Sequence, residues 1–394
     1  MSNQNNAKII LHIDMNAFFC SVACLLNPSL RGKVFAIGRE NSYRGVISSA
    51  SYEARAKGIH AAMSQIDAYN LVPDLIIVHL DYSYYQLYHN KFVAVLKQYS
   101  KLVEVASIDE AYVDITEASI QKHPLIIAKE IQTRILKEIG LSCSIGIAPT
   151  LFLAKMASDM KKPLGITVLR KREVKELLYP LSVADIFGIG KKTYPVLIDN
   201  NIKTIGDFLN PLNKSKVIKL VGDNTYNYVV NHVLGNSSNI VNPNRYSDYE
   251  SISTSQTFDR VIASESEALY ELRKMTREIV NKMDSKNYYT KTITITLRDI
   301  TFKTINRSKS LDDYTNDYNM IYDVVVDLLE ENFNDGNYRL LGVGLSNLKD
   351  LKDLPKPYNL FTIENYDDRK EKINAMIKEY QEKYGEKALF QNKK

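Results

Sequence analysis

Apolar residues follow two spacings along residues 1–170, one typical of strands and one typical of helices. The run KIILH at residues 8–12 predicts a strand that leads to Asp14, and FFCSVACLL at residues 18–26 has the spacing of a buried helix. We therefore expect a region of mixed α and β structure in which the first strand delivers Asp14 to a turn.

A second acidic position follows in the same region. Apolar and polar residues alternate over residues 103–115, on each side of Asp109 and Glu110, as they do in the two strands of a hairpin. We expect this acidic pair to lie at the bend of the hairpin.

The spacing becomes helical over residues 155–219, and the predicted helices are short because proline and glycine interrupt them. Lysine and arginine are concentrated in the same stretch, which makes it a basic region. The Asn- and Ser-rich sequence GNSSNIVNPNRYSD at residues 235–248 follows, and we expect a linker there.

Residues 248–350 predict the element order βαββαβ, which is an α+β domain. Helical spacing over residues 264–283 and near residues 318–332 separates strand-like segments such as TKTITITLRDITFKT. We expect the central strand to carry a series of cations and to give the domain one face suited to phosphates. These cations are Lys286, Lys291, Arg298, Lys303, Arg307 and Lys309.

Composition limits the classes of protein that are possible. The 394 residues are 25% charged and 45% hydrophobic, which excludes a largely disordered, collagen-like or coiled-coil chain. This length predicts about two to four domains. No segment approaches the ~18 consecutive apolar residues of a membrane span, and the N-terminus has no signal-peptide pattern, so we expect a cytoplasmic protein.

The cysteines and the net charge are less informative. Cys20, Cys24 and Cys143 are scattered among apolar residues, which indicates reduced thiols. A net charge of +5 is too small to identify a nucleic-acid partner by itself. The location of the charges matters more than their sum.

Asp14, Asp109 and Glu110 are the residues best suited to chemistry. Two strands that place these acids side by side would supply the anionic oxygens that Mg²⁺ prefers. Two ions about 3.5–4 Å apart would activate an attacking oxygen and stabilise a leaving one. Taken alone, an acidic pair at a bend is more often a solvated turn, so the pair does not decide the function.

Longer blocks of sequence add weight to these acids. They are IDMNAFFCSV (13–22), NPSLRGK (27–33), SYEARAKGI (51–59), ASIDEAYVD (106–114), SIGIAPTLFLAKMASDMKKPLGI (144–166) and DIFGIGKKT (185–193). In order and spacing these blocks resemble the motifs of the Y-family of DNA polymerases, especially the DNA polymerase IV type. The βαββαβ-like domain after the linker also stands in the family's place.

The resemblance implies an α+β fold of the right-hand polymerase type. Its parts would be a ferredoxin-like palm, small fingers, a helical thumb with a helix-hairpin-helix, and a C-terminal α+β little finger. The expected segments are palm at 1–17 and 81–169, fingers at 18–80, thumb at 170–237, linker at 238–247, little finger at 248–350 and a C-terminal tail at 351–394.

The resemblance also implies a chemistry. Asp14, Asp109 and Glu110 would bind two Mg²⁺, with the backbone carbonyl of Met15 completing one coordination shell. A primer 3′-hydroxyl would attack the α-phosphate of a bound dNTP and release pyrophosphate, so catalysis would rest on metal electrostatics and positioning. The implied partners are primer–template DNA and dNTP, and we expect a monomer.

Further residues match the nucleotide site of the family. Arg55 and Lys162 would hold the triphosphate together with the phenol of Tyr52. Phe19 falls at the steric gate, a ring beneath the sugar that excludes a 2′-hydroxyl, whereas Phe18 should face the core. Each would otherwise be an ordinary surface cation or core aromatic. The full nucleotide set is Phe18, Phe19, Ser49, Tyr52, Arg55 and Lys162.

The sequence GIGKK at residues 188–192 matches the hairpin of a helix-hairpin-helix, in which glycines let backbone N–H groups approach a phosphate. The alternative is a tight turn between helices. Including the cations of the C-terminal domain, the DNA contacts we expect are Gly188, Gly190, Lys191, Lys192, Arg298, Lys303 and Arg307.

Two positions depart from the family pattern. Asn16 stands where many relatives have a second aspartate, and the resemblance does not make that residue a metal ligand. Relatives often end in a sliding-clamp peptide with a leading Gln, whereas this chain ends in EKALFQNKK. Leu389 and Phe390 could enter a clamp pocket, and the alternative is an ordinary frayed terminus.

The sequence thus predicts a template-directed, Mg-dependent DNA polymerase of low fidelity that acts in translesion synthesis and DNA damage tolerance. One alternative is another palm-like two-metal enzyme such as a nucleotidyl cyclase, which would not need a basic thumb. The other is a catalytically silent DNA-binding or clamp accessory protein, and the intact acids and cations argue against it.

Overall fold

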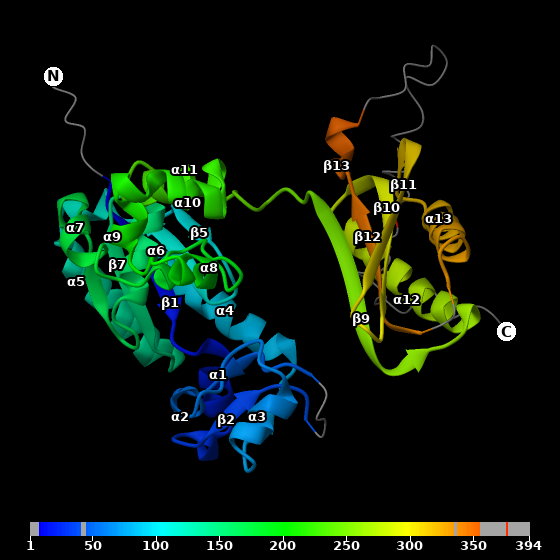
Figure 1. Cartoon of the computed structure of the whole chain (residues 1–394), viewed down its shortest axis with the longest axis horizontal. Helices are drawn as coiled ribbons and strands as arrows, with labels where there is room; N and C mark the ends of the chain where they lie inside the picture. The colour runs from blue at the N-terminus through cyan, green and yellow to red at the C-terminus, as the bar shows by residue number, and fades with distance from the viewer. Residues whose placement is uncertain (1–7, 41–44, 335–336, 355–375, 377–394) are drawn as a thin grey trace. The chain divides into compact units, whose positions relative to one another are not determined.

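The computed structural model describes residues 8–40, 45–334, 337–354 and 376. The chain divides into two compact units, Met1–Asp248 and Tyr249–Lys394 (Figure 1). The predicted clamp peptide with Leu389 and Phe390 lies outside the described residues.

The first unit is built on a five-stranded sheet, here called the first sheet, in the order β5-β6-β1-β7-β8. β1 lies in the middle and is antiparallel to β6 and to β7, and β7 is parallel to β8. The predicted first strand and the predicted acidic hairpin are both confirmed, since β5 and β6 are antiparallel neighbours. The strands are β1 (Ile10–Met15), β5 (Val103–Val105), β6 (Glu110–Asp114), β7 (Cys143–Ala148) and β8 (Ile166–Val168).

The two faces of β1 meet different cores. Leu11 and Ile13 pack into a core together with the helices that cover one face of the first sheet. Ile10 on the opposite face belongs to a second core together with α6 (Leu151–Asp159) and the helices that follow it. The helices of the first core are α1 (Phe18–Leu26), α4 (Tyr82–Leu96) and α5 (Pro124–Arg134), with a π-helical turn at Ile135–Ile139.

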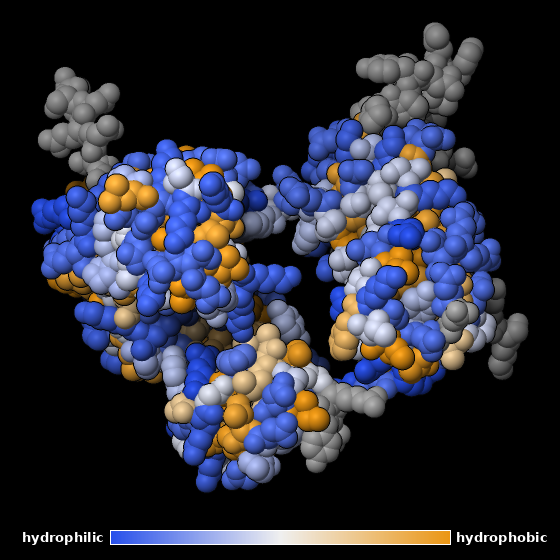
Figure 2. All heavy atoms as spheres, in the orientation of Figure 1, coloured by the Kyte–Doolittle hydropathy of each residue, from blue (hydrophilic) through white to orange (hydrophobic). Residues whose placement is uncertain are grey.

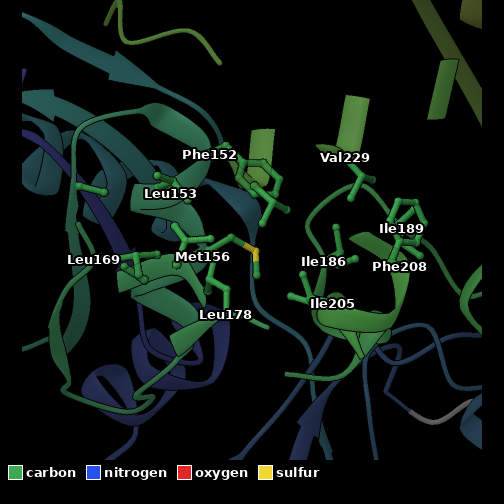
Figure 3. Packing of buried hydrophobic residues seen from close by; sticks show 14 of the residues in the cluster. Phe152, Leu153, Met156, Leu169, Leu178, Ile186, Ile189, Ile205, Phe208 and Val229 are labelled. Carbon is green, nitrogen blue, oxygen red and sulfur yellow. The ribbon is translucent and has the colours of Figure 1, made fainter. Parts of the chain in front are cut away.

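The helix α6 lies unusually close to the first sheet because β7 has a glycine beneath it. A Cβ atom at Gly146 would lie 2.0 Å from the carbonyl oxygen of Ala154 and 2.4 Å from the backbone nitrogen of Ser158. Phe152 and Met156 of the same helix enter the second core, where Figure 3 shows them in one cluster with residues such as Ile186. One helix therefore connects the sheet to the basic helical region.

A small three-stranded sheet lies in the region expected to form the fingers. Its order is β3-β2-β4, with β2 antiparallel to β3 and parallel to β4. Its elements are β2 (Phe35–Ile37), β3 (Ser49–Ala50), α2 (Tyr52–Ala56), α3 (Gln65–Leu71) and β4 (Ile76–Val78), after a 3-10 turn at Pro28–Leu30.

The basic region is helical and its helices are short, as predicted. They are α7 (Val174–Leu177), α8 (Tyr194–Asp199), α9 (Ile205–Leu209), α10 (Lys214–Val221) and α11 (Asp223–Val233), with 3-10 turns at Lys171–Glu173, Val183–Asp185 and Pro211–Asn213. The chain after α11 returns to the first sheet. Buried Glu104 on β5 accepts a hydrogen bond from the Asn242 backbone N–H at 2.8 Å and pairs with Arg245, so this part of the predicted linker is bound to the first unit.

The second unit has the predicted βαββαβ order, followed by a short strand. Its sheet, here called the second sheet, has the order β11-β10-β12-β9, and both helices pack on one face of it. The elements are β9 (Ser251–Ile262), α12 (Glu265–Asp284), β10 (Tyr288–Asp299), β11 (Thr304–Thr315), α13 (Tyr318–Glu330), β12 (Tyr338–Ser346), β13 (Lys349–Asp350) and a 3-10 turn at Leu351–Asp353.

The expectation that the cations of this unit share one face of a central strand is wrong. They are spread over the turn before β10, over β10 and β11, and over the turn between those strands, and the two arginines lie on opposite faces. Arg298 pairs with Thr304 on the open face of the second sheet, whereas Arg307 lies opposite the core residue Ile295 and contacts Asn332 near the end of α13. Successive residues of a strand alternate between faces, so Ile295 and Arg298, three residues apart on β10, lie on opposite faces. Arg307 pairs with Ile295 and therefore lies on the face opposite Arg298.

The surface and the thiols agree with the sequence analysis. Figure 2 shows polar residues over most of the visible face of each unit, with apolar residues in separate areas. Among the described residues, no helix has both the length and the apolar character that crossing a bilayer requires. Cys20, Cys24 and Cys143 are free thiols.

Candidate active site

Neighbouring strands bring the predicted acids to one end of the first sheet. Asp14 pairs in register with Glu110, the first residue of β6. Asp109 precedes it in the bend of the hairpin, and its backbone carbonyl accepts a hydrogen bond from the Met15 N–H at 3.0 Å. The backbones of all three acids are therefore fixed by strand pairing.

The carboxylates of Asp14 and Glu110 face two ammonium groups. Lys155 Nζ on α6 lies 3.0 Å from Asp14 Oδ2 and 2.6 Å from Glu110 Oε1. Lys162 Nζ lies 2.7 Å from the same Asp14 oxygen. Asp159 contacts both lysines, Lys155 at 3.4 Å and Lys162 at 2.7 Å. Three carboxylates thus share two cations, and the Lys155 side chain is only 9% exposed.

Burial and charge act in opposite directions on this group. Burial raises the pKa of Asp14 to about 6, and the hydrogen bond with Glu110 adds to the rise, while Lys155 and Lys162 oppose it. Burial also opposes ionisation of Glu110, but the contacts with His12 and Asp14 outweigh it and hold the pKa of Glu110 below its usual value. Asp14 is therefore the carboxylate of this pair that takes a proton first.

The lysines stay charged despite their surroundings. Burial lowers the pKa of Lys155 and of Lys162, but the neighbouring carboxylates, led by Asp14, outweigh burial and raise both above the usual value. A buried ammonium group needs such partners, because an isolated charge away from water is strongly unfavourable.

His12, beneath Glu110, is fully buried. The Ser158 hydroxyl donates to the Lys155 carbonyl at 2.8 Å, so His12 Nδ1 donates to Ser158 Oγ at 2.8 Å. This leaves His12 Nε2 facing Glu110 Oε2 at 3.6 Å, without a hydrogen-bond partner in the described part of the chain. Burial lowers the pKa of His12 and outweighs the opposing effect of Glu110, so burial favours the neutral ring.

The third acid has a different partner. Asp109 Oδ1 accepts a hydrogen bond from Ser107 Oγ at 2.6 Å, and none of the ion pairs found among the described residues includes Asp109. Within those residues no three His, Cys, Asp or Glu side chains converge in a geometry ready for an ion. The donors still suit a hard divalent cation, because Asp14, Glu110 and the Met15 carbonyl offer only oxygen and already attract two positive charges.

The predicted triphosphate residues lie near Asp14. Arg55 Nε donates to the Ala50 carbonyl at 2.9 Å, and its guanidinium lies over the Tyr52 ring at 5.1 Å. Burial raises the pKa of Tyr52, and Arg55 and Lys162 oppose the rise while Asp14 adds to it. These four side chains are therefore within electrostatic range of one another.

The two phenylalanines differ in the way that the sequence predicts. Phe18 is buried, and Phe19 is only partly buried, with its ring against the ring of Tyr85 at a centroid distance of 4.5 Å. Ser49 is also buried and accepts a hydrogen bond from Cys20 Sγ at 3.7 Å. Tyr85 thus supports one edge of the predicted gate.

Asn16 makes two side-chain hydrogen bonds that hold the backbone near the site. Its Oδ1 accepts a hydrogen bond from the Leu164 N–H at 3.0 Å, and its Nδ2 donates to Ser144 Oγ at 2.9 Å. An aspartate would keep the acceptor and lose the donor. Asn16 therefore ties the end of β1 to the turn that follows Lys162, which explains why an amide is suitable here.

The GIGKK hairpin is exposed between a 3-10 turn and α8. Gly188 has a φ of +98°, and a Cβ there would lie 3.1 Å from the Tyr228 ring, so glycine is the residue that this turn accepts. In the described part of the chain the backbone N–H groups of Gly190, Lys191 and Lys192 make no hydrogen bond. Both lysine side chains are exposed.

The open face of the second sheet carries hydroxyl groups and a groove of about 400 Å³. Thr294 bonds to Ser308 at 2.8 Å across β10 and β11, and Thr296 bonds to Asn306 at 2.9 Å. Arg298 lines the same groove, and Lys303 lies in the exposed turn beyond it. The face is polar and nearly free of acids: the residues lining the groove are Ser251, Ser253, Thr254, Ser255, Thr294, Thr296, Arg298, Asn306, Leu340, Val343, Gly344, Leu345 and Ser346.

The sequence analysis missed the residues that support the acids from α6. Lys155, Ser158 and Asp159 are spaced i, i+3 and i+4, so they share one face of α6. His12 was missed as well. A usable signal was present, because three polar residues at helical spacing interrupt the apolar run LFLAKMASD directly after a strand with a central glycine.

Comparison with known proteins gives the same result across both units. The impB/mucB/samB family matches residues 13–159, and the C-terminal domain of that family matches residues 249–355. DNA polymerase IV of Oceanobacillus iheyensis is 39% identical over 100% of this chain and 93% of its own length. DNA polymerase IV 1 of Bacillus subtilis is 36% identical over 97% of this chain and 92% of its own length.

Solved structures agree. A Y-family DNA polymerase chimera, Dbh-Dpo4(243-245)-Dbh, superposes with a TM-score of 0.76 and 27% sequence identity, covering 87% of this chain and 99% of its own. The α+β class is confirmed. With the paired acids on β1 and β6 and the matches in both units, the chain belongs to the Y-family of DNA polymerases and is a DNA-directed DNA polymerase of the DNA polymerase IV type.

Proposed function

We propose that this translesion polymerase extends a primer by Mg²⁺-dependent nucleotidyl transfer with two ions, and does so with low fidelity. Asp14, Asp109 and Glu110 would hold the ions, together with the Met15 carbonyl. The ions would supply electrostatic stabilisation of the attacking and leaving oxygens. The observation that carries this proposal is the register of Asp14 opposite Glu110 with Asp109 beside it.

The nucleotide would be held by side chains already close to Asp14. Arg55 and Lys162 would bind the triphosphate, because two cations suit its charge and the Tyr52 ring orients the guanidinium. Phe19 would lie beneath the sugar and exclude a 2′-hydroxyl. Its partly buried ring rests on Tyr85 and is therefore fixed in position.

Primer–template DNA would be held without reading its sequence. The exposed N–H groups of the hairpin from Gly188 to Lys192 would bind phosphates, with Lys191 and Lys192 adding charge. In the second unit Arg298 and Lys303 would contact the backbone at the hydroxyl-lined face. Arg307, although it lies on the helix side of its strand, is long enough to reach a phosphate at the edge formed by β11.

Two further proposals concern assembly. We expect the polymerase to act as a monomer, which sedimentation of the full-length protein tests. We also propose that the segment with Leu389 and Phe390 binds a sliding clamp; replacing both by alanine should abolish binding to the clamp and leave clamp-free primer extension unchanged.

Primer extension on undamaged and abasic templates tests the catalytic assignment. We expect full extension by the wild-type protein and a loss of at least about 10³-fold in Asp109→Ala/Glu110→Ala, since several charges stabilise the transition state. Equal extension by both proteins would contradict the assignment. No extension by either would favour an accessory role, and DNA binding by both proteins controls for folding.

A further inference from the structure

The position of Lys155 is the least expected feature of the active site. This lysine of α6 places its ammonium between the two carboxylates that are proposed to bind metal, 3.0 Å from Asp14 and 2.6 Å from Glu110. The close approach of α6 over Gly146 makes this reach possible. The ammonium of Lys155 therefore contacts the same carboxylate oxygens that a divalent cation would need.

A metal ion and the Lys155 ammonium would compete for the same oxygens of Asp14 and Glu110. Like charges a few ångströms apart repel each other strongly when the site is partly buried. Binding of a cation must therefore break or weaken the contacts of Lys155 with Asp14 and Glu110, and also the contact of Lys162 with Asp14. A lysine that leaves needs another anion, because an unpaired buried charge is unfavourable.

Asp159 is the anion within reach. It lies one helical turn after Lys155 on α6, its side chain is 45% exposed, and it already contacts Lys155 at 3.4 Å and Lys162 at 2.7 Å. Lys155 can strengthen its contact with Asp159 by a change of side-chain rotamer, without movement of the helix.

We propose that Lys155 is a displaceable counter-ion of the carboxylate site and that Asp159 receives it when a divalent cation binds. The inference rests on the proposed function for the identity of the metal ligands. Lys155 is a positioning residue: without metal it holds Asp14 and Glu110 together against their mutual repulsion, and it makes metal binding weaker than the carboxylates alone would allow.

Lys162 links the same exchange to the nucleotide. Its ammonium is shared between Asp14 and Asp159, and a triphosphate would draw it away from Asp14. The oxygen of Asp14 would then lose one competing cation, so metal and nucleotide would each strengthen the binding of the other.

Mn²⁺ binding to the full-length protein without DNA tests the proposal, with free Mn²⁺ measured by electron paramagnetic resonance. We expect Lys155→Met to bind Mn²⁺ roughly tenfold more tightly than the wild type, and Asp159→Asn to bind it several-fold more weakly. Lys122→Met is the matched control, because it removes the lysine of an exposed pair with Glu130 and should leave the affinity unchanged.

Two more measurements separate this role from a general effect of charge or packing. In the Lys155→Met background, Asp159→Asn should lose most of its effect, because the cation that Asp159 receives is absent. The melting temperature of metal-free Lys155→Met should be lower than that of the wild type, and saturating Mn²⁺ should remove the difference. A residue that only packed the core would lower stability with and without metal.

Unchanged or weaker Mn²⁺ binding by Lys155→Met would overturn the proposal, as would additive effects of the two substitutions. Lys155→Gln serves as the second variant if Lys155→Met does not fold. The outcome is independent of polymerase activity. If Lys155→Met binds Mn²⁺ more tightly and the wild-type protein fails to extend a primer, the counter-ion role of Lys155 is supported and the proposed function is contradicted.

Discussion

The two sheets of the chain carry their polar residues in different ways. In the first sheet, Asp14 and Glu110 are paired across β1 and β6, and their charges are held by Lys155 from the helix above. In the second sheet, Thr294 and Ser308 are paired across β10 and β11, and their hydroxyl groups lie on the open face. Both arrangements use antiparallel register to place two side chains together.

The carboxylate pair and the hydroxyl pair differ in charge, and therefore in the surroundings that each needs. Buried carboxylates need counter-charges nearby, and under the proposed function the same carboxylates and lysines would position metal and triphosphate. Hydroxyl groups keep no net charge and can exchange partners with water or phosphate oxygens, which would suit the proposed contact with DNA that does not read its sequence. The proposed function therefore places the chemical step at the first sheet and adaptable contacts with DNA at the second.

Substitution of the glycine beneath α6 should have the largest effect. Gly146→Ala puts a Cβ atom 2.0 Å from the Ala154 carbonyl oxygen, so α6 must move and take Lys155 with it. Overpacking of this kind costs roughly 3 kcal/mol, and we expect primer extension to fall at least about tenfold because the carboxylates lose their alignment. Urea denaturation and primer extension measure the two effects.

The second sheet offers the matched control. A Cβ at Gly344 would meet only side-chain atoms at ordinary contact distance, Ser253 Cβ at 3.5 Å and Thr294 Cβ at 3.9 Å. Gly344→Ala should change the free energy of unfolding by less than about 1 kcal/mol. Similar losses in both variants would show that close approach of α6 is not what the glycine of the first sheet provides.

Removing the predicted steric gate should change the selectivity for dNTP over rNTP without changing the affinity for primer–template DNA. Phe19→Ala deletes a partly buried ring that rests on Tyr85, and we expect ribonucleotide incorporation to rise roughly 10- to 200-fold, the range for a steric pocket. Competition between dNTP and rNTP in single-turnover extension measures it. Primer–template affinity should stay the same, and unchanged sugar discrimination would remove Phe19 from this role.

Removing a cation of the second sheet should weaken DNA binding and leave sugar discrimination unchanged. Arg298→Ala takes one positive charge from the open face, so we expect several-fold weaker binding to primer–template and a slope of log K against log salt reduced by about 0.9. Arg307→Ala is the comparison, because Arg307 contacts Asn332 on the helix side, and we expect it to have a smaller effect. Equal effects would mean that cations on both faces of the second sheet reach the DNA.

The sequence predicts much of this fold because apolar periodicity is strong in both units. The acidic hairpin and the βαββαβ order were both visible in the alternation of apolar and polar residues. The face of Arg298 relative to Arg307 was not visible, because it depends on the number of residues in the turn between β10 and β11, and a one-residue change reverses the face.

The active site was predictable where its residues lie in β1 and the hairpin, and less so where they lie on α6. Asp14 and Glu110 stand at the ends of strands whose pairing follows from the pattern. Lys155 reaches them only because Gly146 lets α6 approach, and such a tertiary contact leaves a weak trace in a single sequence. The roles of Asp109 and Phe19 depend on partners that the fold alone does not supply.

The smallest effect we expect is a dependence of stability on pH that is specific to the first sheet. Asp114 on β6 accepts hydrogen bonds from Lys8 and Thr116. Burial opposes its ionisation, but the bond from Lys8 and those from Thr116 outweigh burial and lower the pKa of Asp114 from 3.8. A lowered carboxyl pKa stabilises the folded state above the unfolded-state value, and this stability is lost as pH falls through the folded-state value.

Asp114→Asn should therefore lower the free energy of unfolding by about 1 kcal/mol near neutral pH, and the difference from the wild type should shrink as pH falls below 3.8. Thr294→Val in the second sheet removes a hydroxyl that does not titrate, so its effect should be constant over the same range. Melting temperatures of the three proteins across this pH range measure both. A constant difference for Asp114→Asn would mean that its charge contributes nothing, and the contrast between paired carboxylates in the first sheet and paired hydroxyl groups in the second would then rest on Asp14 and Glu110 alone.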